Sequence, residues 1–176
     1  MKTIQCAFLL LIFGFTLSGT VNAETFTDSE HHFQISYGPA WEINVDLSPT
    51  IKFSLISKQH IAGSSLAGSH RPMANAHVSV KSLDPSISLQ IYIKNDIGVA
   101  SAIWTIIEEK QLPSLREEHK LLVLKRNMGP FSQKVYKLLV KAHGNIYDLS
   151  CAFPINQATL FDQRCTSLIN SFSVLP

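Results

Sequence analysis

The sequence predicts an α+β fold in which an antiparallel sheet is flanked by two helices. Short segments with alternating polar and apolar residues occur in both halves of the chain, and such alternation is typical of half-buried strands. A central and a C-terminal segment instead carry apolar residues at three- or four-residue spacing, as amphipathic helices do. The chain has 176 residues, of which 45% are hydrophobic and 16% are charged, and this composition excludes a disordered or fibrous protein.

The N-terminus has the features of a cleavable export signal. Lys2 supplies a positive charge, Cys6–Leu17 is an apolar stretch of twelve residues, and the small residue Ala23 precedes the expected cleavage point. A retained membrane anchor is the alternative, but twelve helical residues span about 18 Å of a hydrocarbon core about 30 Å thick. We therefore predict a signal peptide at 1–23, a single domain at 24–176, no stable membrane insertion after cleavage, and a periplasmic or secreted location.

The charge balance argues against nucleic acid as a partner. Fifteen Lys and Arg residues against 13 Asp and Glu residues give a net charge of +2, and the basic residues form no run. Domains that bind nucleic acid usually carry a concentrated basic patch, which this composition does not provide.

Cys151 and Cys165 are the two cysteines of the predicted mature domain. An even pair in an exported chain favours a disulfide, although two buried thiols or one reactive thiol are the alternatives. Their separation of 14 positions would make the bridge worth about 3 kcal/mol in the chain-entropy model.

The first half of the domain reads as strands joined by turns. Residues 24–30 form a polar lead-in, and a turn at Gly38-Pro39 is followed at once by Trp41. The predicted strands are 32–37, 51–56 and 77–81. His31 and His32 are expected to lie in a strand and to face opposite sides. Gln59–Ala76 is a long segment rich in Gly, Ser and Ala, and loops of this length are often functional.

A long central helix is predicted from Asp84 to about Lys110. Pro85 fits the first turn, and an apolar stripe at helical spacing runs from Leu89 to Ile107. The alternative is a strand over 87–93, because apolar residues also alternate there.

The second half returns to strands and ends in a helix. The predicted strands are 120–126, 131–142 and 146–153, with turns at 127–130 and 143–145. A C-terminal helix is predicted at 159–172, with Asn156 or Thr159 as its N-cap.

Three segments of this chain resemble the Mog1/PsbP-like family. The first is Phe33–Trp41, where the family usually has Tyr-Pro-x-Gly-Trp and this chain has Gly and Pro in another order. The second is the strand pair Tyr136–Leu139 and Tyr147–Ala152. The third is Leu168–Phe172, which is similar to the closing Ser-Phe of the family. The resemblance implies an α/β/α sandwich on a strongly twisted antiparallel sheet. It also implies a non-catalytic protein that binds a larger partner, with no catalytic residues to transfer.

The search for chemistry finds no catalytic motif. The sequence has no Gly-x-Ser-x-Gly, no P-loop and no His-Glu-x-x-His. His60, His70 and His77 belong to or flank the long loop, but their spacing is not that of a metal site. The adjacent carboxylates Glu108-Glu109 and Glu117-Glu118 are flanked by Lys or Arg and are interpreted as solvated charges at helix ends. We expect no enzyme activity, no cofactor and no specific metal.

We therefore expect an exported, non-catalytic accessory protein that docks on a larger protein partner in the periplasm. The long loop and the turn at 38–41 would face this partner, with Trp41, His60, His70 and Arg71 as candidate contacts; Trp41 would act as an anchor if it is exposed, and as core packing otherwise. The alternative is a small-ligand or metal-binding module that uses the histidines of the 59–77 loop.

Overall fold

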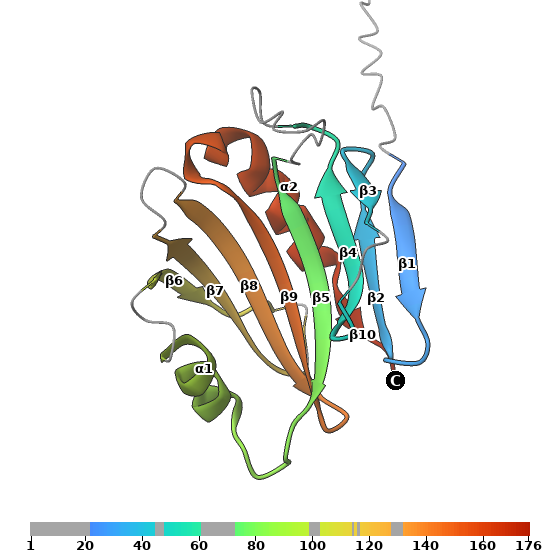
Figure 1. Cartoon of the computed structure of the whole chain (residues 1–176). Coiled ribbons are helices and arrows are strands. Elements are labelled where there is room, and N and C mark those ends of the chain that lie inside the picture. Colours follow the sequence, from blue (N-terminus) through green and yellow to red (C-terminus); the bar gives the residue numbers. More distant parts are fainter. Residues whose placement is uncertain are drawn as a thin grey trace, which may run out of the picture.

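The protein is built around a large, twisted antiparallel sheet (Figure 1). The computed structural model describes residues 22–44, 48–60, 73–98, 103–113, 115, 117–127 and 132–176. In these residues the sheet runs in the order β3 (Trp41–Ile43), β4 (Ile51–Ser57), β5 (Asn75–Ser82), β9 (Asn145–Pro154), β8 (Gln133–Ala142), β7 (Glu118–Arg126) and β6 (Trp104–Lys110). Every neighbouring pair is antiparallel, as predicted.

Both faces of this sheet are covered. On one face lie the helix α2 (Ala158–Ser171), preceded by the short 3-10 helix η2 (Ile155–Gln157), and a small sheet ordered β1 (Glu24–Asp28), β2 (Phe33–Tyr37) and β10 (Ser173–Val174). On the opposite face lies the helix α1 (Leu89–Gly98), near β7 and β8 (Figure 1). The predicted α+β fold with a sheet flanked by helices is confirmed.

The alternation of side chains in β8 and β9 divides them between two cores. Leu138 and Leu149 are fully or almost fully buried in the core shared with α2, whereas Leu139 and Ile146 are buried in the core shared with α1. The period of two that predicts these strands therefore also assigns each side chain to a face.

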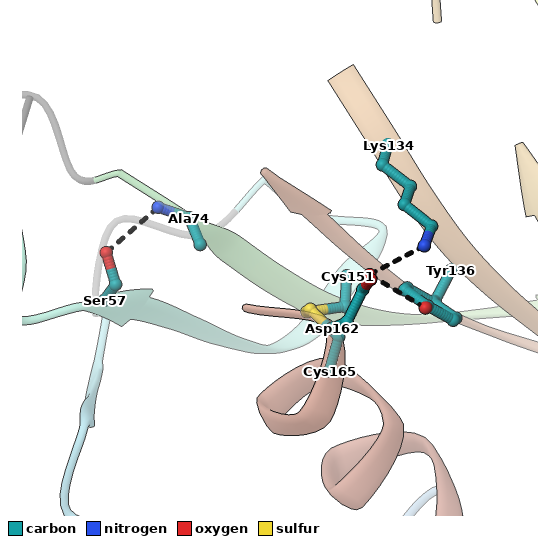
Figure 2. Close-up of a disulfide and its surroundings, with 7 residues drawn as sticks. All are labelled: Ser57, Ala74, Lys134, Tyr136, Cys151, Asp162 and Cys165. Atoms are coloured by element: carbon teal, nitrogen blue, oxygen red, sulfur yellow. Dashed lines mark hydrogen bonds and ion pairs between the residues drawn. A yellow bond between two sulfur atoms is a disulfide. The ribbon is translucent and has the colours of Figure 1, made fainter. Parts of the chain in front are cut away.

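A disulfide between Cys151 and Cys165 joins the centre of the large sheet to α2 (Figure 2). The two Cα atoms are 5.8 Å apart, within the range that a disulfide spans, and both side chains are fully buried. Asp162, one turn earlier on α2, accepts hydrogen bonds from Lys134 Nζ at 2.7 Å and from Tyr136 Oη at 2.9 Å. The predicted bridge is confirmed, and α2 is held to β8 and β9 by both covalent and polar contacts.

The hairpin between β8 and β9 has a two-residue turn. Ala142 pairs with Asn145, and between them His143 and Gly144 have φ angles of 52° and 72°. Two successive positive φ angles are the mark of a type I′ turn, whose twist matches that of the flanking strands. The predicted turn at 143–145 is confirmed.

The central helix is shorter than predicted. It spans Leu89–Gly98 and buries Leu89, Ile93 and Ile97, which confirms a helix rather than a strand over 87–93. Trp104–Lys110, predicted as the end of this helix, is the edge strand β6 and pairs with β7. The β-branched residues of β6 favour an extended backbone, and pairing gives its backbone groups partners on β7.

Three predictions for the flanking segments are also corrected. The polar lead-in at 24–30 contains β1, which pairs with β2 along its whole length. His31 and His32 lie in the turn between these strands, where Asp28 Oδ1 accepts a hydrogen bond from the backbone N–H of His31. Neither predicted residue caps α2, because the N-cap position is Gln157 and makes no side-chain capping bond.

Several predictions fall outside the described residues. These are most of the signal peptide at 1–23, most of the Gln59–Ala76 loop with His70 and Arg71, and the turn residues 128–130.

Candidate functional site

A surface groove of about 440 Å³ lies between the turn that follows β2 and the exposed side of α2. We call it the Trp41 groove; its lining residues are Ser36–Trp41, Gln163, Arg164, Ser167 and Leu168. The sequence segment that forms one wall is the predicted turn at 38–41.

Trp41 forms the inner wall of this groove and is not an exposed anchor. Its backbone N–H donates to the carbonyl of Gly38 at 3.1 Å, which closes the turn. Its ring lies 6.4 Å from that of Phe161 on α2, and the residue is only 4% exposed. Trp41 would anchor a partner only if its side chain were exposed, and it is buried. The alternative interpretation of Trp41 as a core residue is therefore the one that applies.

Both described ends of the long loop lie beside the Trp41 groove. The backbone N–H of Lys58 donates to Ala40 at 3.0 Å, and Arg164 donates to the Gln59 side chain across the groove edge. The two ends are joined to each other, because Met73 N donates to Gln59 O at 2.8 Å. The structure therefore brings the described ends of the loop close to the turn at 38–41.

The fully buried Ser57 hydroxyl fastens these loop ends (Figure 2). It donates to the carbonyl of Gln59 at 2.8 Å and accepts from the backbone N–H of Ala74 at 2.9 Å. His60 follows at the exposed margin. A contact between His60 and a partner remains a prediction.

A second hollow, of about 400 Å³, lies on the face of the large sheet that α1 covers in part. We call it the Arg126 cavity. Two cross-strand rows supply its polar residues, because residues paired across antiparallel strands share a face. One row is His77, Ser150 and Lys137; the other is Gln133, Arg126 and Trp104.

Lys137 lies between two carboxylates at one end of this cavity. Its Nζ is 2.5 Å from Asp148 Oδ2 and 3.3 Å from Asp96 Oδ2. Burial alone would lower the pKa of Lys137, but the charge of Asp148 and the hydrogen bonds to both carboxylates outweigh it and raise the pKa above its ordinary value. Lys137 is therefore a neutralised structural cation and not a proton donor or nucleophile near neutral pH.

His77 lines this cavity. Burial lowers its pKa, and although Asp148 acts in the opposite direction, Lys137 adds to the lowering. The neutral imidazole is thus favoured at pH 7. Ser150 Oγ donates to Asp148 Oδ1 at 2.9 Å and not to His77, and the described residues contain no group of three potential metal ligands.

Arg126 occupies the other end of the cavity. Its guanidinium carbon lies 5.5 Å from the ring centre of Trp104, which comes from β6. Among the described residues no carboxylate lies within ion-pair distance of it, and its buried Nε–H has no hydrogen-bond acceptor.

Sequence reasoning missed this cavity. One sequence feature could have indicated it. Alternate positions of β8 lie on one face of the sheet, and along this face polar Gln133 and Lys137 are interspersed with apolar Val135 and Leu139. Glu108 and Glu109 are exposed as predicted, but they lie in the edge strand β6 and not at a helix end, and Glu109 pairs with Lys120 at 2.8 Å. Glu118 lies at the start of β7, where its Oε1 accepts a hydrogen bond from the backbone N–H of Leu89 at 3.3 Å.

Three solved structures have a backbone fold similar to that of this chain. PsbP from the cyanobacterium Synechocystis matches 89% of this chain and 95% of its own, with a TM-score of 0.62 and 10% identity. The Ran-binding protein Mog1p of Saccharomyces cerevisiae matches 89% and 97%, with a TM-score of 0.58 and 9% identity. LpqN of Mycobacterium tuberculosis, described as involved in cell envelope biogenesis, matches 82% and 83%, with a TM-score of 0.61 and 8% identity.

No family model and no curated protein matches the chain in sequence. At 8–10% identity the likeness is one of backbone architecture, and it is found over more than four fifths of the chain. The three-dimensional structure of this protein is a Mog1/PsbP-like α+β fold.

Proposed function

We propose that this protein is an exported, non-catalytic accessory protein that docks on a larger protein partner. The main support for this proposal is the Trp41 groove, a surface hollow that lies beside the two hydrogen-bonded ends of the long loop. In this proposal His60, His70 and Arg71 contribute contacts from the loop, and Trp41 supports the groove from below.

The groove offers a partner both apolar area and a positive rim. Leu168 and the ring of Trp41 form its floor, while Arg164 lies at its edge above Phe161, 5.3 Å from the ring centre. Arginine and aromatic side chains in such settings are frequent energetic centres of protein interfaces. The likeness in fold to Mog1p adds support, since that protein is described as Ran-binding.

Export is supported by the buried disulfide and by the predicted signal peptide. Structural disulfides persist in oxidising compartments and are rare in reducing ones. Within the described residues, no helix has both the length and the apolar character needed to span a bilayer. We accordingly propose a periplasmic or secreted location for the domain at 24–176.

The docking proposal is tested by photo-crosslinking in the host cell. A photoreactive amino acid is placed at Ser167 in the groove, at Pro39 on the opposite wall, and at Asn95 on α1 as an exposed control away from the groove. We expect the same single adduct, identified by mass spectrometry, from Ser167 and Pro39 and not from Asn95.

A deletion of residues 62–72 supplies the second arm. We expect it to weaken the adduct from Ser167 while the melting temperature stays close to that of the intact chain, because Ser57, Gln59 and Met73 still fasten the loop ends. An equal adduct at Asn95, or unchanged capture after the deletion, would contradict the proposed docking surface.

A further inference from the structure

The Arg126 cavity contains a cation without a matching anion. Arginine stays protonated at every physiological pH, so this half-buried guanidinium carries a full charge. The ring of Trp104, whose centre is 5.5 Å from the guanidinium carbon, offers a cation–π contact but no hydrogen-bond acceptor. A charged donor in a partly buried position is costly when its acceptors are missing.

The described part of the chain supplies no carboxylate as an ion-pair partner for Arg126. In the described residues each acidic side chain near the cavity is already engaged: Asp148 with Lys137 and Ser150, and Asp96 with Lys137. The segments next to Trp104 and Arg126 in sequence, residues 99–102 and 128–131, contain neither Asp nor Glu.

The rest of the cavity suits the body of a small organic molecule. Ile97, Leu124 and Val135 supply apolar surface beside Trp104. Asn75, Gln133 and Ser150 add uncharged hydrogen-bonding groups. A volume of about 400 Å³ is within the range of small-molecule sites. The wall combines this apolar surface with polar and charged side chains, so it suits a ligand that has both an apolar body and a polar group.

We propose that the Arg126 cavity binds a small organic monocarboxylate. The carboxylate accepts hydrogen bonds from the Arg126 guanidinium, whose fork of donors matches its two oxygens. The apolar body of the ligand lies against Trp104 and Leu124. This site is on the opposite face of the sheet from α2 and is independent of the proposed docking groove.

Asp96 restricts the ligand to a single negative charge. Its carboxylate lines the same cavity, is 31% exposed, and shares Lys137 at 3.3 Å with the closer Asp148. A second carboxylate on the ligand would therefore meet a like charge, and the described residues that line the cavity include no further cation to offset it. We expect discrimination against dicarboxylates for this reason.

The test uses five probes on the folded domain. Phenylacetate and hexanoate are compared with the neutral phenylacetamide, with succinate and with inorganic phosphate, by isothermal titration and by amide and indole shifts in ¹⁵N-correlated NMR spectra. We expect the two monocarboxylates to shift the Trp104 indole and the Ser150 amide. Phenylacetamide is expected to bind about tenfold more weakly, or about 1.4 kcal/mol.

Three variants identify the groups responsible. Arg126→Gln should weaken monocarboxylate binding at least about tenfold, as expected for loss of a charge-assisted hydrogen bond. Lys125→Gln removes the same charge from the neighbouring position on the other face of β7 and should leave binding unchanged. Asp96→Asn, on the surface of α1, should improve succinate binding, and it keeps the proposal testable if Arg126→Gln unfolds.

The proposal is overturned if no monocarboxylate shifts the Trp104 indole at millimolar concentration, or if phenylacetamide binds as well as phenylacetate. Preferential binding of inorganic phosphate would also contradict it. Because the groove variants and crosslinks report on another surface, failure here leaves the docking experiment unaffected, and the reverse also holds.

Discussion

Lys137 on β8 and Asp148 on β9 form an ion pair of 2.5 Å whose side chains are only 14% and 7% exposed. The pair lies between the apolar core under α1 and the open part of the Arg126 cavity. Ser150 completes the coordination of Asp148 by donating a hydrogen bond to its other oxygen. The buried carboxylate is therefore satisfied from two neighbouring positions of the sheet.

Breaking this pair from one side should be costly. Lys137→Met leaves Asp148 charged and buried, and we expect it to lower the free energy of unfolding by about 3 kcal/mol, as for other buried pairs that lose one partner. The measurement is urea denaturation at pH 7. Adding Asp148→Asn removes the orphaned charge and should restore more than half of the loss; a double variant as unstable as the single one would contradict this account.

Reduction of the Cys151–Cys165 disulfide should also destabilise the domain. The bridge closes a loop with a sequence separation of 14, for which the chain-entropy model gives about 3 kcal/mol. We expect this decrease in the free energy of unfolding with a reductant. The variant with both cysteines replaced by alanine should be insensitive to the reductant, and an equal response of that variant would show that another effect was being measured.

Ser171 fastens the end of α2 to the small sheet. Its hydroxyl accepts from the backbone N–H of Ser36 at 3.1 Å and lies within hydrogen-bond distance of the carbonyls of Ser36 and Leu168, at 2.8 and 2.7 Å. We expect Ser171→Ala to cost about 1–3 kcal/mol of unfolding free energy, because it leaves a backbone N–H without its partner.

Ser167→Ala is the matched control for this hydroxyl. Ser167 is exposed and lies one turn earlier on α2, so its replacement should change stability by less than about 0.5 kcal/mol. Equal effects of the two variants in chemical denaturation would rule out a special role for Ser171.

The stability of the domain should fall on mild acidification, in part through His77. Burial lowers the pKa of His77 in the folded state below its ordinary value of about 6.5, so the unfolded chain binds more protons as the pH falls. The stabilising contribution is complete above the unfolded pKa and is lost as the pH falls below it. We expect His77→Gln to reduce the loss of unfolding free energy between pH 7 and pH 5, measured by urea denaturation; a loss equal to that of the unchanged chain would contradict the prediction.

Local patterns were sufficient for the strongly periodic elements. The alternation in 133–142 and 146–153 predicts strands whose faces are the two cores observed, and the apolar stripe of 159–172 predicts α2. These predictions succeed because burial of one face is encoded within the segment itself. The pairing of Cys151 with Cys165 follows from composition, since the predicted mature chain has two cysteines.

The short and edge elements depended on partners elsewhere in the chain. Glu24–Asp28 is polar and becomes a strand because β2 offers it an unpaired edge, and Trp104–Lys110 becomes a strand rather than a helix because β7 does. An apolar pattern that fits both a helix and a strand does not decide between the two structures. The unpaired backbone groups of a neighbouring edge strand do decide, because they offer hydrogen bonds to an extended segment.

The sequence by itself determined the fold class, the principal strands with their faces, the C-terminal helix and the cysteine pair. The tertiary structure alone decided that Trp41 lies beneath a groove, and that His77 on β5 shares one cavity with Arg126 and Lys137, whose strands β7 and β8 come much later in the chain. The physical reason is register: which residues stand opposite one another across a sheet depends on pairings between distant strands, and no local period records them.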